Sequence, residues 1–437
     1  MRHANRLAAA VAGATMVIAV AACGTPAAEQ PAPSGSPTGR ASPAPAGQLP
    51  EDTDPMAWFG ERVFPLMLQQ GPAPTNPVYS PLSIYLALGM VSDGARGDTA
   101  QQFTQVLGAD RDSVNRDAAA VLKDYAQYQG PDGGERQAGG PDDGAPVKPV
   151  LNVADAIWVD QGFPIEDSFR HDVAEFYQSD ASELDLQLPA STVKINDWVS
   201  KNTNGLIDKI IQPEDTTDLR VFLANALYFK GQWASPAIAG HTAPADFTTG
   251  TGKTVKADMM TFDSLAGGYL ELPDGTKGAL MDYTDGRFAM LTVMPGGGVE
   301  SLAWDGQTIS KWLDQVEDKP TKSLVVKLPK WQTDSGPVDL IPVLKAAGLE
   351  APFDPVTADL SGIGEGDLYI NLIRHRAVVN VDEDGTEAAA VTAVGVADSA
   401  YADPTTIEFN QPFVYSIIDK ATGLPLFLGI INDPTDR

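Results

Sequence analysis

Cysteine is almost absent from this 437-residue chain, in which Cys23 is the only one. A single thiol excludes an internal disulfide, a C-x-x-C redox motif and a cysteine-based metal site. Histidine is also scarce, with only His3, His171, His241 and His375. The sequence contains no G-x-S-x-G elbow, no H-E-x-x-H motif and no dinucleotide-binding glycine pattern. Without a nucleophile–base set we do not expect an enzyme, and we predict neither a metal nor a cofactor.

Positive charge is in short supply. The chain has 30 Lys and Arg residues against 58 Asp and Glu, which gives a formal net charge of −28. Such an acidic surface argues against binding to nucleic acid and to heparin-like polyanions. Most of this charge is explained by solubility alone.

Long hydrophobic runs are missing too. The apolar run from Leu7 to Val20 follows Arg2 and Arg6, and it is too short to span a membrane but typical of a secretory signal. The small residues before Cys23 resemble the lipobox of bacterial lipoproteins, which implies cleavage before Cys23 and acylation of its thiol. The alternative is an ordinary signal cut elsewhere. We expect an exported protein, lipid-anchored at Cys23 to the outer face of the cell membrane or extracellular.

The segment after the signal cannot form a core. Residues 23–53 are dominated by Ala, Pro, Gly, Ser and Thr, a composition that favours extended, polyproline-like chain. We therefore predict a signal peptide over residues 1–22, a tether over 23–53 and one folded domain over 54–437. We find no internal repeat, and we expect a monomer.

The domain combines helical and strand patterns. Ser80-Pro81 predicts a helix start, and apolar residues then recur at helical spacing as far as Asp93-Gly94. Two more helices are predicted, one within residues 193–211, where Asn204-Gly205 would break it, and one over residues 338–347. Strands are predicted over residues 156–159, 222–229, 288–294 and 324–328, with a C-terminal hairpin formed by 413–418 and 425–431.

One segment could add a strand to a sheet. Residues 385–403 contain no proline, so every residue keeps the N–H that a ladder needs. In a strand, the small side chains of Thr386, Ala388 and Ala390 would share one face, whereas Glu387 would lie on the other. The alternatives are an alanine-rich helix and a flexible surface loop.

Several ordered sequence blocks carry a family resemblance. From about Met56 to Thr435 the chain resembles the serpins, a family of serine protease inhibitors. The matching blocks are Asn76-Pro-Val-Tyr-Ser80-Pro-Leu-Ser83, Gly94-Ala-Arg-Gly-Asp-Thr99, Leu151-Asn-Val-Ala-Asp-Ala, Ile195-Asn-Asp-Trp-Val, Asn225-Ala-Leu-Tyr-Phe-Lys-Gly-Gln-Trp233, Gly385-Thr-Glu-Ala-Ala-Ala390, Phe409-Asn-Gln-Pro-Phe413, Pro425-Leu-Phe-Leu-Gly429 and Asn432-Asp-Pro-Thr435.

The resemblance implies both a fold and a mechanism. The fold class is α+β of the multidomain type, with a large central mixed sheet, further sheets, about eight to nine helices and an exposed reactive-centre loop. Inhibitory serpins offer this loop to a protease, which forms an acyl-enzyme, and the cut loop then inserts into the central sheet. The resemblance places the hinge of the loop at Glu383, Gly385, Thr386, Ala388, Ala389 and Ala390.

The scissile bond is harder to place. The distance usual for the family, counted from Gly385, gives Ser399–Ala400; counting back from Phe409 gives a bond near Ala397, and Tyr401 is a third option. We prefer Ser399–Ala400. There is no Lys or Arg from Ala377 to Asp419. Because trypsin-like proteases require a cationic residue, we expect elastase-, subtilisin- or chymotrypsin-like targets, held as covalent complexes.

The resemblance also implies structural roles. Ser80, Ser83, Asn225 and His375 match a polar cluster beneath the sheet where its strands part. Glu383 and Lys330 match an ion pair near the insertion point, with Trp233 close by. The main alternative function is a non-inhibitory serpin that acts as a carrier or binding protein, which charged or proline residues in the hinge would favour.

Overall fold

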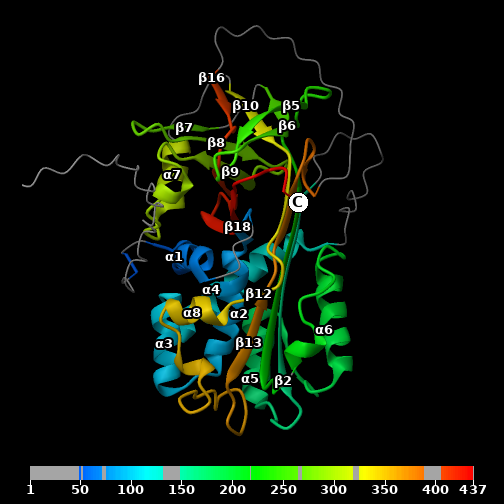
Figure 1. Ribbon diagram of the computed structural model, residues 1–437. Coiled ribbons are helices and arrows are strands. Elements are labelled where there is room, and N and C mark those ends of the chain that lie inside the picture. Colours follow the sequence, from blue (N-terminus) through cyan, green and yellow to red (C-terminus); the bar gives the residue numbers. More distant parts are fainter. Residues whose placement is uncertain are drawn as a thin grey trace, which may run out of the picture. The chain divides into compact units, whose positions relative to one another are not determined.

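Three β-sheets and eight α-helices make up the described part of the chain (Figure 1). The computed structural model describes residues 49–50, 53–70, 75–130, 148–216, 218–263, 268–317, 324–387 and 405–436. Among them, no helix is long and apolar enough to cross a membrane. The helices are α1 (Pro55–Gln70), α2 (Pro81–Asp93), α3 (Gly97–Leu107), α4 (Arg111–Tyr125), α5 (Asp167–Tyr177), α6 (Pro189–Asn202), α7 (Thr308–Glu317) and α8 (Ile341–Ala346).

The largest sheet is mixed. β4 lies at its centre, pairing antiparallel with β2 and β15 and parallel with β13. Its main path runs β11-β14-β15-β4-β13-β12, and β2 links β4 to β3. The strands are β2 (Val150–Asp160), β3 (Asp180–Leu184), β4 (Val221–Gln232), β11 (Trp331–Asp334), β12 (Val338–Asp339), β13 (Ile370–His375), β14 (Val378–Val381) and β15 (Gly385–Thr386).

Two smaller sheets complete the fold. A six-stranded sheet has the order β1-β18-β17-β9-β8-β7, and a four-stranded sheet has the order β16-β10-β6-β5. Their bounds are β1 (Val78–Tyr79), β5 (Ala243–Thr248), β6 (Thr254–Phe262), β7 (Tyr269–Glu271), β8 (Lys277–Asp282), β9 (Phe288–Met294), β10 (Leu324–Pro329), β16 (Thr405–Glu408), β17 (Phe413–Asp419) and β18 (Leu424–Ile431).

Both faces of the large sheet are covered, which explains the continuous apolar run of β4. On one face α6 packs Ile195 and Val199 against Phe222 of β4. On the other lies α2, all of whose residues are buried. Figure 1 shows α6 on one side of β2 and β13, and α2, α4 and α8 on the other. The face toward α2 is where the predicted polar cluster lies.

The element predictions are largely confirmed. Helix α2 begins after Ser80, whose Oγ accepts a hydrogen bond from the Ser83 N–H, as its N-cap pattern predicts. The predicted helix over 338–347 is partly wrong, since residues 338–339 form β12 against β13 and only 341–346 are helical. Cross-strand pairing, which local propensity does not detect, decides those two residues. Helix α6 begins four residues earlier than predicted, with Pro189 in its first turn.

Candidate functional site

The chain reverses direction after β14 and enters the large sheet a second time. Asp382 caps this reversal by accepting hydrogen bonds from the N–H groups of Asp384 (2.9 Å) and Gly385 (3.2 Å). The next two residues form β15, where Thr386 pairs with Val381 of β14 and Gly231 of β4. The first hinge residues therefore lie between β14 and β4.

Gly385 is the residue that permits this entry. A Cβ added to it would lie 2.0 Å from the carbonyl oxygen of Gly231 and 2.8 Å from the Cα of Gln232. Its φ of +156° also lies at the edge of the region that side chains rarely adopt. No other residue type fits here unless β15 moves away from β4.

Thr386 is held on the buried side of the sheet. Its side chain is 1% exposed, and its hydroxyl lies 2.6 Å from that of Tyr283. The Tyr283 ring stacks on Trp233, with 4.7 Å between centroids and 9° between planes. Thr386 thus has the buried orientation predicted for the even-numbered hinge residues.

Trp233 fixes the turn before the hinge. Its indole Nε1–H donates to the carbonyl of Asp382 (3.0 Å), and its backbone N–H donates to the carbonyl of Asp384 (2.9 Å). The N–H of Ala237 donates to the carbonyl of Glu383 (3.1 Å). Because Trp233 directly follows β4, these bonds anchor the turn to the end of that strand.

Glu383 forms the predicted ion pair. Lys330 Nζ lies 2.7 Å from Glu383 Oε2, and the Thr242 hydroxyl donates to Oε1 (2.8 Å). Partial burial opposes ionisation of Glu383, but the hydrogen bonds from Lys330 and Thr242 outweigh it and lower the pKa. The pair joins the turn to the residue between β10 and β11.

The strands β4 and β13 diverge a few residues before the C-terminal end of β4, where the hinge pairs. They pair in parallel only over Val221–Asn225 and Ile370–His375, and the last pair is Asn225 with His375. Beyond it the chain continues as β14, which pairs with β11 and β15 rather than with β4. The point of divergence therefore coincides with two of the predicted site residues.

A buried polar row crosses three strands at this point. Asp155 of β2 is the register partner of Asn225, which in turn is the partner of His375. Asn225 donates through Nδ2 to Asp155 Oδ1 and to the carbonyl of Ser83 (2.7 Å). The Ser80 N–H donates to His375 Nε2 (3.1 Å). All four predicted members of the polar cluster are thus brought together.

Burial controls protonation in this row. It lowers the pKa of His375 to about 3, so the imidazole is neutral and can accept the Ser80 bond. Burial raises the pKa of Asp155 to about 7, only partly opposed by the hydrogen bond from Asn225. The row therefore contains a carboxyl group that titrates near neutral pH.

Sequence reasoning missed two residues of this site. Asp155 is the one acid inside the apolar segment Leu151–Val159, a signal that could have singled it out. Tyr283 is brought to Thr386 by non-local pairing, and we find no sequence signal for it.

Other predicted residues lie outside the described part of the chain. They are Ala388, Ala389 and Ala390 of the hinge, Ala397, Ser399, Ala400 and Tyr401 around the reactive bond, and the lipidation residue Cys23.

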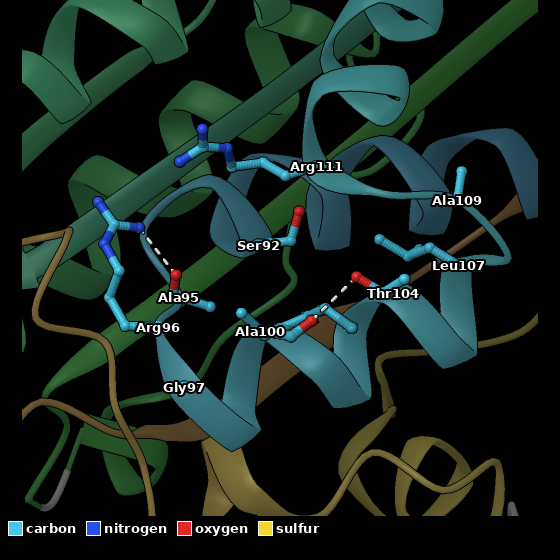
Figure 2. A pocket seen from close by; sticks show the side chains of 10 residues that line it. Ser92, Ala95, Arg96, Gly97, Ala100, Thr104, Leu107, Ala109 and Arg111 are labelled. Carbon is cyan, nitrogen blue, oxygen red and sulfur yellow. Dashed lines mark hydrogen bonds between the residues drawn. The ribbon is translucent and has the colours of Figure 1, made fainter.

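A separate pocket of about 260 Å³ lies between the end of α2, α3 and the start of α4 (Figure 2). Its rim carries Arg96 and Arg111, and its floor is mostly apolar. Arg96 donates to the carbonyls of Asp93 and Ala95, while Arg111 pairs with Asp112. None of the site residues above lines it, so we assign it no part in the site.

Comparison with known proteins identifies the family. A family model described as Serpin (serine protease inhibitor) matches residues 56–434. A serine protease inhibitor of Cyanea capillata is 31% identical over 370 residues, which are 83% of this chain and 93% of that protein. Alpha-1-antiproteinase S of Cavia porcellus is 30% identical over 409 residues, 90% and 92% of the two chains. The native structure of tengpin, a thermophilic serpin, matches with a TM-score of 0.72 at 25% identity, covering 89% of this chain and 97% of tengpin. The chain belongs to the serpin family.

The predicted α+β serpin fold is therefore confirmed, with its large mixed sheet and two further sheets. Serpins as a family are protease inhibitors rather than proteases, and serine proteases are their general partners.

Proposed function

We propose that this chain is a suicide inhibitor of serine proteases. A protease would attack the segment between β15 and β16 and form an acyl-enzyme through its serine. The cleaved segment would then enter the large sheet as an added strand and carry the tethered protease with it. The position of Gly385 and Thr386 carries this proposal, because these residues already pair with β4.

The register of β15 indicates what further insertion requires. Thr386 lies opposite Gly231 in an antiparallel pair, so continuing the strand would bring Thr392 opposite Asn225 and Val396 opposite Val221. Residues Val221–Asn225 now pair with β13. Insertion past residue 391 would therefore require β4 and β13 to separate, which breaks the buried polar row.

Two sets of contacts would restrain premature insertion. The ion pair of Glu383 with Lys330 and the hydrogen bonds from Trp233 hold the turn at the C-terminal end of β4. In the N-terminal half of β4, a second set of hydrogen bonds holds β4 and β13 to the start of α2. Its members are Ser80, Ser83, Asn225 and His375. Insertion would begin when cleavage frees the strand to displace them.

The loop composition supports a class of target. We propose Ser399–Ala400 as the reactive bond, which suits elastase- or subtilisin-like enzymes; Ala397 is an alternative of the same kind, and Tyr401 would suit chymotrypsin-like ones. The absence of Lys and Arg from Ala377 to Asp419 argues against trypsin-like targets.

A panel of proteases tests the function. We would mix the purified protein with pancreatic elastase, subtilisin, chymotrypsin and trypsin, then analyse the products by denaturing gel and mass spectrometry. We expect a band at the summed mass that survives denaturant, together with a released peptide beginning at Ala400. Cleavage without a trapped complex for every enzyme would contradict inhibition and favour a substrate or carrier serpin.

The N-terminal segment has a separate proposed role. We propose that residues 1–22 direct export, that Cys23 is acylated, and that residues 23–53 tether the serpin domain (residues 54–437) to the outer face of the cell membrane. The support is the small residues before the only cysteine. Mass spectrometry of the N-terminal peptide should find a diacylglycerol adduct on Cys23, and Cys23→Ser should release the protein from the membrane fraction. An unmodified Cys23 would refute the anchor.

A further inference from the structure

Asp155 occupies the middle of β2 and has no basic partner among the residues that the structure describes. Its carboxyl group is buried, and its Oδ1 accepts a hydrogen bond from Asn225 Nδ2. The second oxygen, Oδ2, has no hydrogen-bond partner among the described residues, and the same holds for Asn225 Oδ1 and Ser83 Oγ. A buried carboxylate with a single donor is costly, whereas a neutral carboxylic acid adds a donor to a cluster that contains unmatched acceptors.

The position of Asp155 connects its carboxyl group to the opening of the large sheet. Asp155 is paired with Asn225 within a ladder that joins β2 to β4 over Val150–Val159. The separation of β4 from β13 breaks the next link of the row, from Asn225 to His375. Opening therefore admits water beside the Asp155 carboxyl while leaving Asp155 attached to β4.

We propose that Asp155 is a positioning residue that makes opening of the large sheet pH-dependent: neutral Asp155 favours a closed β4–β13 seam, and ionised Asp155 favours its opening. This inference rests on the proposed function, because opening of that seam is the step that loop insertion requires. Asp155 acts through Asn225 and touches neither the protease nor the reactive bond.

The sign of this pH dependence follows from the difference between the closed and the open environment of the Asp155 carboxyl group. In the closed sheet the pKa of Asp155 is raised to about 7 by burial, whereas an open, hydrated carboxyl returns toward the ordinary value of about 4. Between these values the open form gains up to about tenfold per pH unit relative to the closed form. Above pH 7 both forms are ionised, so the gain stops.

In the closed sheet three neighbouring titratable groups keep their charge over this interval. They are Tyr85 of α2, Tyr177 of α5, which interacts electrostatically with Asp155 and Tyr85, and His375 of β13. Burial raises the pKa of Tyr85 and of Tyr177 far above neutrality and lowers that of His375 to about 3. On the β3 side Asp180 is exposed to solvent. Opening of the seam would also hydrate His375, whose pKa would return toward 6.5, so below that pH His375 contributes a trend of opposite sign, and substitution is needed to separate the two groups.

A peptide-insertion experiment tests this without a protease. We would add a synthetic peptide with the sequence of residues 386–396 and measure its rate of incorporation by native mass spectrometry at pH 5 to 8.5. We expect the ratio of the wild-type rate to the Asp155→Asn rate to rise by up to about tenfold per pH unit from pH 5 to 7 and to level off above, because His375 contributes equally to both proteins. Asp155→Asn keeps an acceptor for Asn225 but no titrating charge, so its profile should retain only the opposite trend of His375. Asp180→Asn, on the neighbouring strand, should behave as the wild type.

The possible failures are distinguishable. Parallel pH profiles for the wild type and Asp155→Asn would overturn the role of Asp155 while leaving insertion intact. Failure of the peptide to enter at any pH would overturn the insertion mechanism itself, and this inference with it. If Asp155→Asn does not fold, His375→Gln decides, because Asp155 is then the one of these two groups left to titrate and a flat rate from pH 5 to 7 contradicts the proposal.

Discussion

The hydroxyl groups of Thr386 and Tyr283 lie 2.6 Å apart in the buried interior, although 103 residues separate them in the chain. This contact fixes which side of the hinge faces inward. It also leaves no room for a longer side chain, because Tyr283 is itself stacked on Trp233.

We therefore expect Thr386→Arg to abolish trapping. The guanidinium would have to enter a site where a buried charge has no partner, which costs several kcal/mol and stalls insertion at its first step. Denaturing gels with elastase should show cleaved protein and active enzyme in place of a stable complex. Thr248→Arg, at an exposed position of the edge strand β5, is the matched control and should trap normally.

Gly385→Ala should destabilise the native hinge. The new methyl group would overlap the carbonyl of Gly231, so β15 must shift, at a cost of about 1–3 kcal/mol. Urea unfolding measures this loss. Gly205→Ala is the control, because Gly205 also has a positive φ but nothing within 4 Å of its added Cβ. Equal losses for the two variants would show that backbone strain, and not the contact with Gly231, is responsible.

Lys330→Ala should have a small effect on stability. The ion pair with Glu383 is about one-third exposed, and pairs of this kind contribute about 0–1 kcal/mol. Because the pKa of Glu383 is lowered in the folded state, its contribution is present above the ordinary pKa near 4.5 and is lost as the pH falls through that range. We would measure the free energy of unfolding of Lys330→Ala at low and high salt. The control is Lys327→Ala, because Lys327 forms an ion pair with Glu408 that is similarly exposed. A loss of several kcal/mol, unchanged by salt, would contradict this view.

His375 should make the protein less stable in acid. Its pKa falls from 6.5 to about 3 on folding, so the unfolded chain binds a proton that the native state does not. Stability contributed by neutral His375 is complete above pH 6.5 and is lost progressively down to pH 3, by at most about 5 kcal/mol. His375→Gln should flatten this part of the pH–stability curve, whereas His171→Gln, at an exposed site, should not. Identical curves for the wild type and His375→Gln would exclude the role.

Ser399→Arg should redirect the inhibitor. If Ser399 precedes the reactive bond, a cationic residue there creates a trypsin-like recognition site and removes the elastase-like one. Covalent complexes with trypsin should appear, and those with elastase should be lost. A trypsin complex formed by Ala397→Arg or Tyr401→Arg, but not by Ser399→Arg, would move the reactive bond accordingly.

Local patterns predicted the local parts of this molecule. The N-cap at Ser80 and the short, largely apolar run Phe288–Met294 are encoded in adjacent residues, and both elements form where expected. The family blocks led us to predict a hinge beginning near Gly385 and a cluster of four polar residues, and the structure brings these four together where the strands part. The sequence did not indicate which strands would pair with one another in the sheet.

Three residues illustrate this limit. Val338 follows a helical pattern but pairs with His375 of β13, because a strand edge was available. Tyr283 meets Thr386 only after β8 and β15 are both in place. Asp155 carries a pKa near 7 only because β4, α2 and α5 surround it. In each case long-range contacts decide the outcome.

The row of Asp155, Asn225 and His375 also sets an order of assembly. Its members are 70 and 150 residues apart, so a chain that emerges N-terminus first can pair β2 with β4 long before β13 exists. During that interval β4 has an unpaired edge, which is a template for any extended strand. The proline-free segment 385–403 of a second copy keeps every N–H that pairing with this edge would require. The timing of synthesis and the local concentration of chains would therefore decide between a closed monomer and strand-exchanged oligomers.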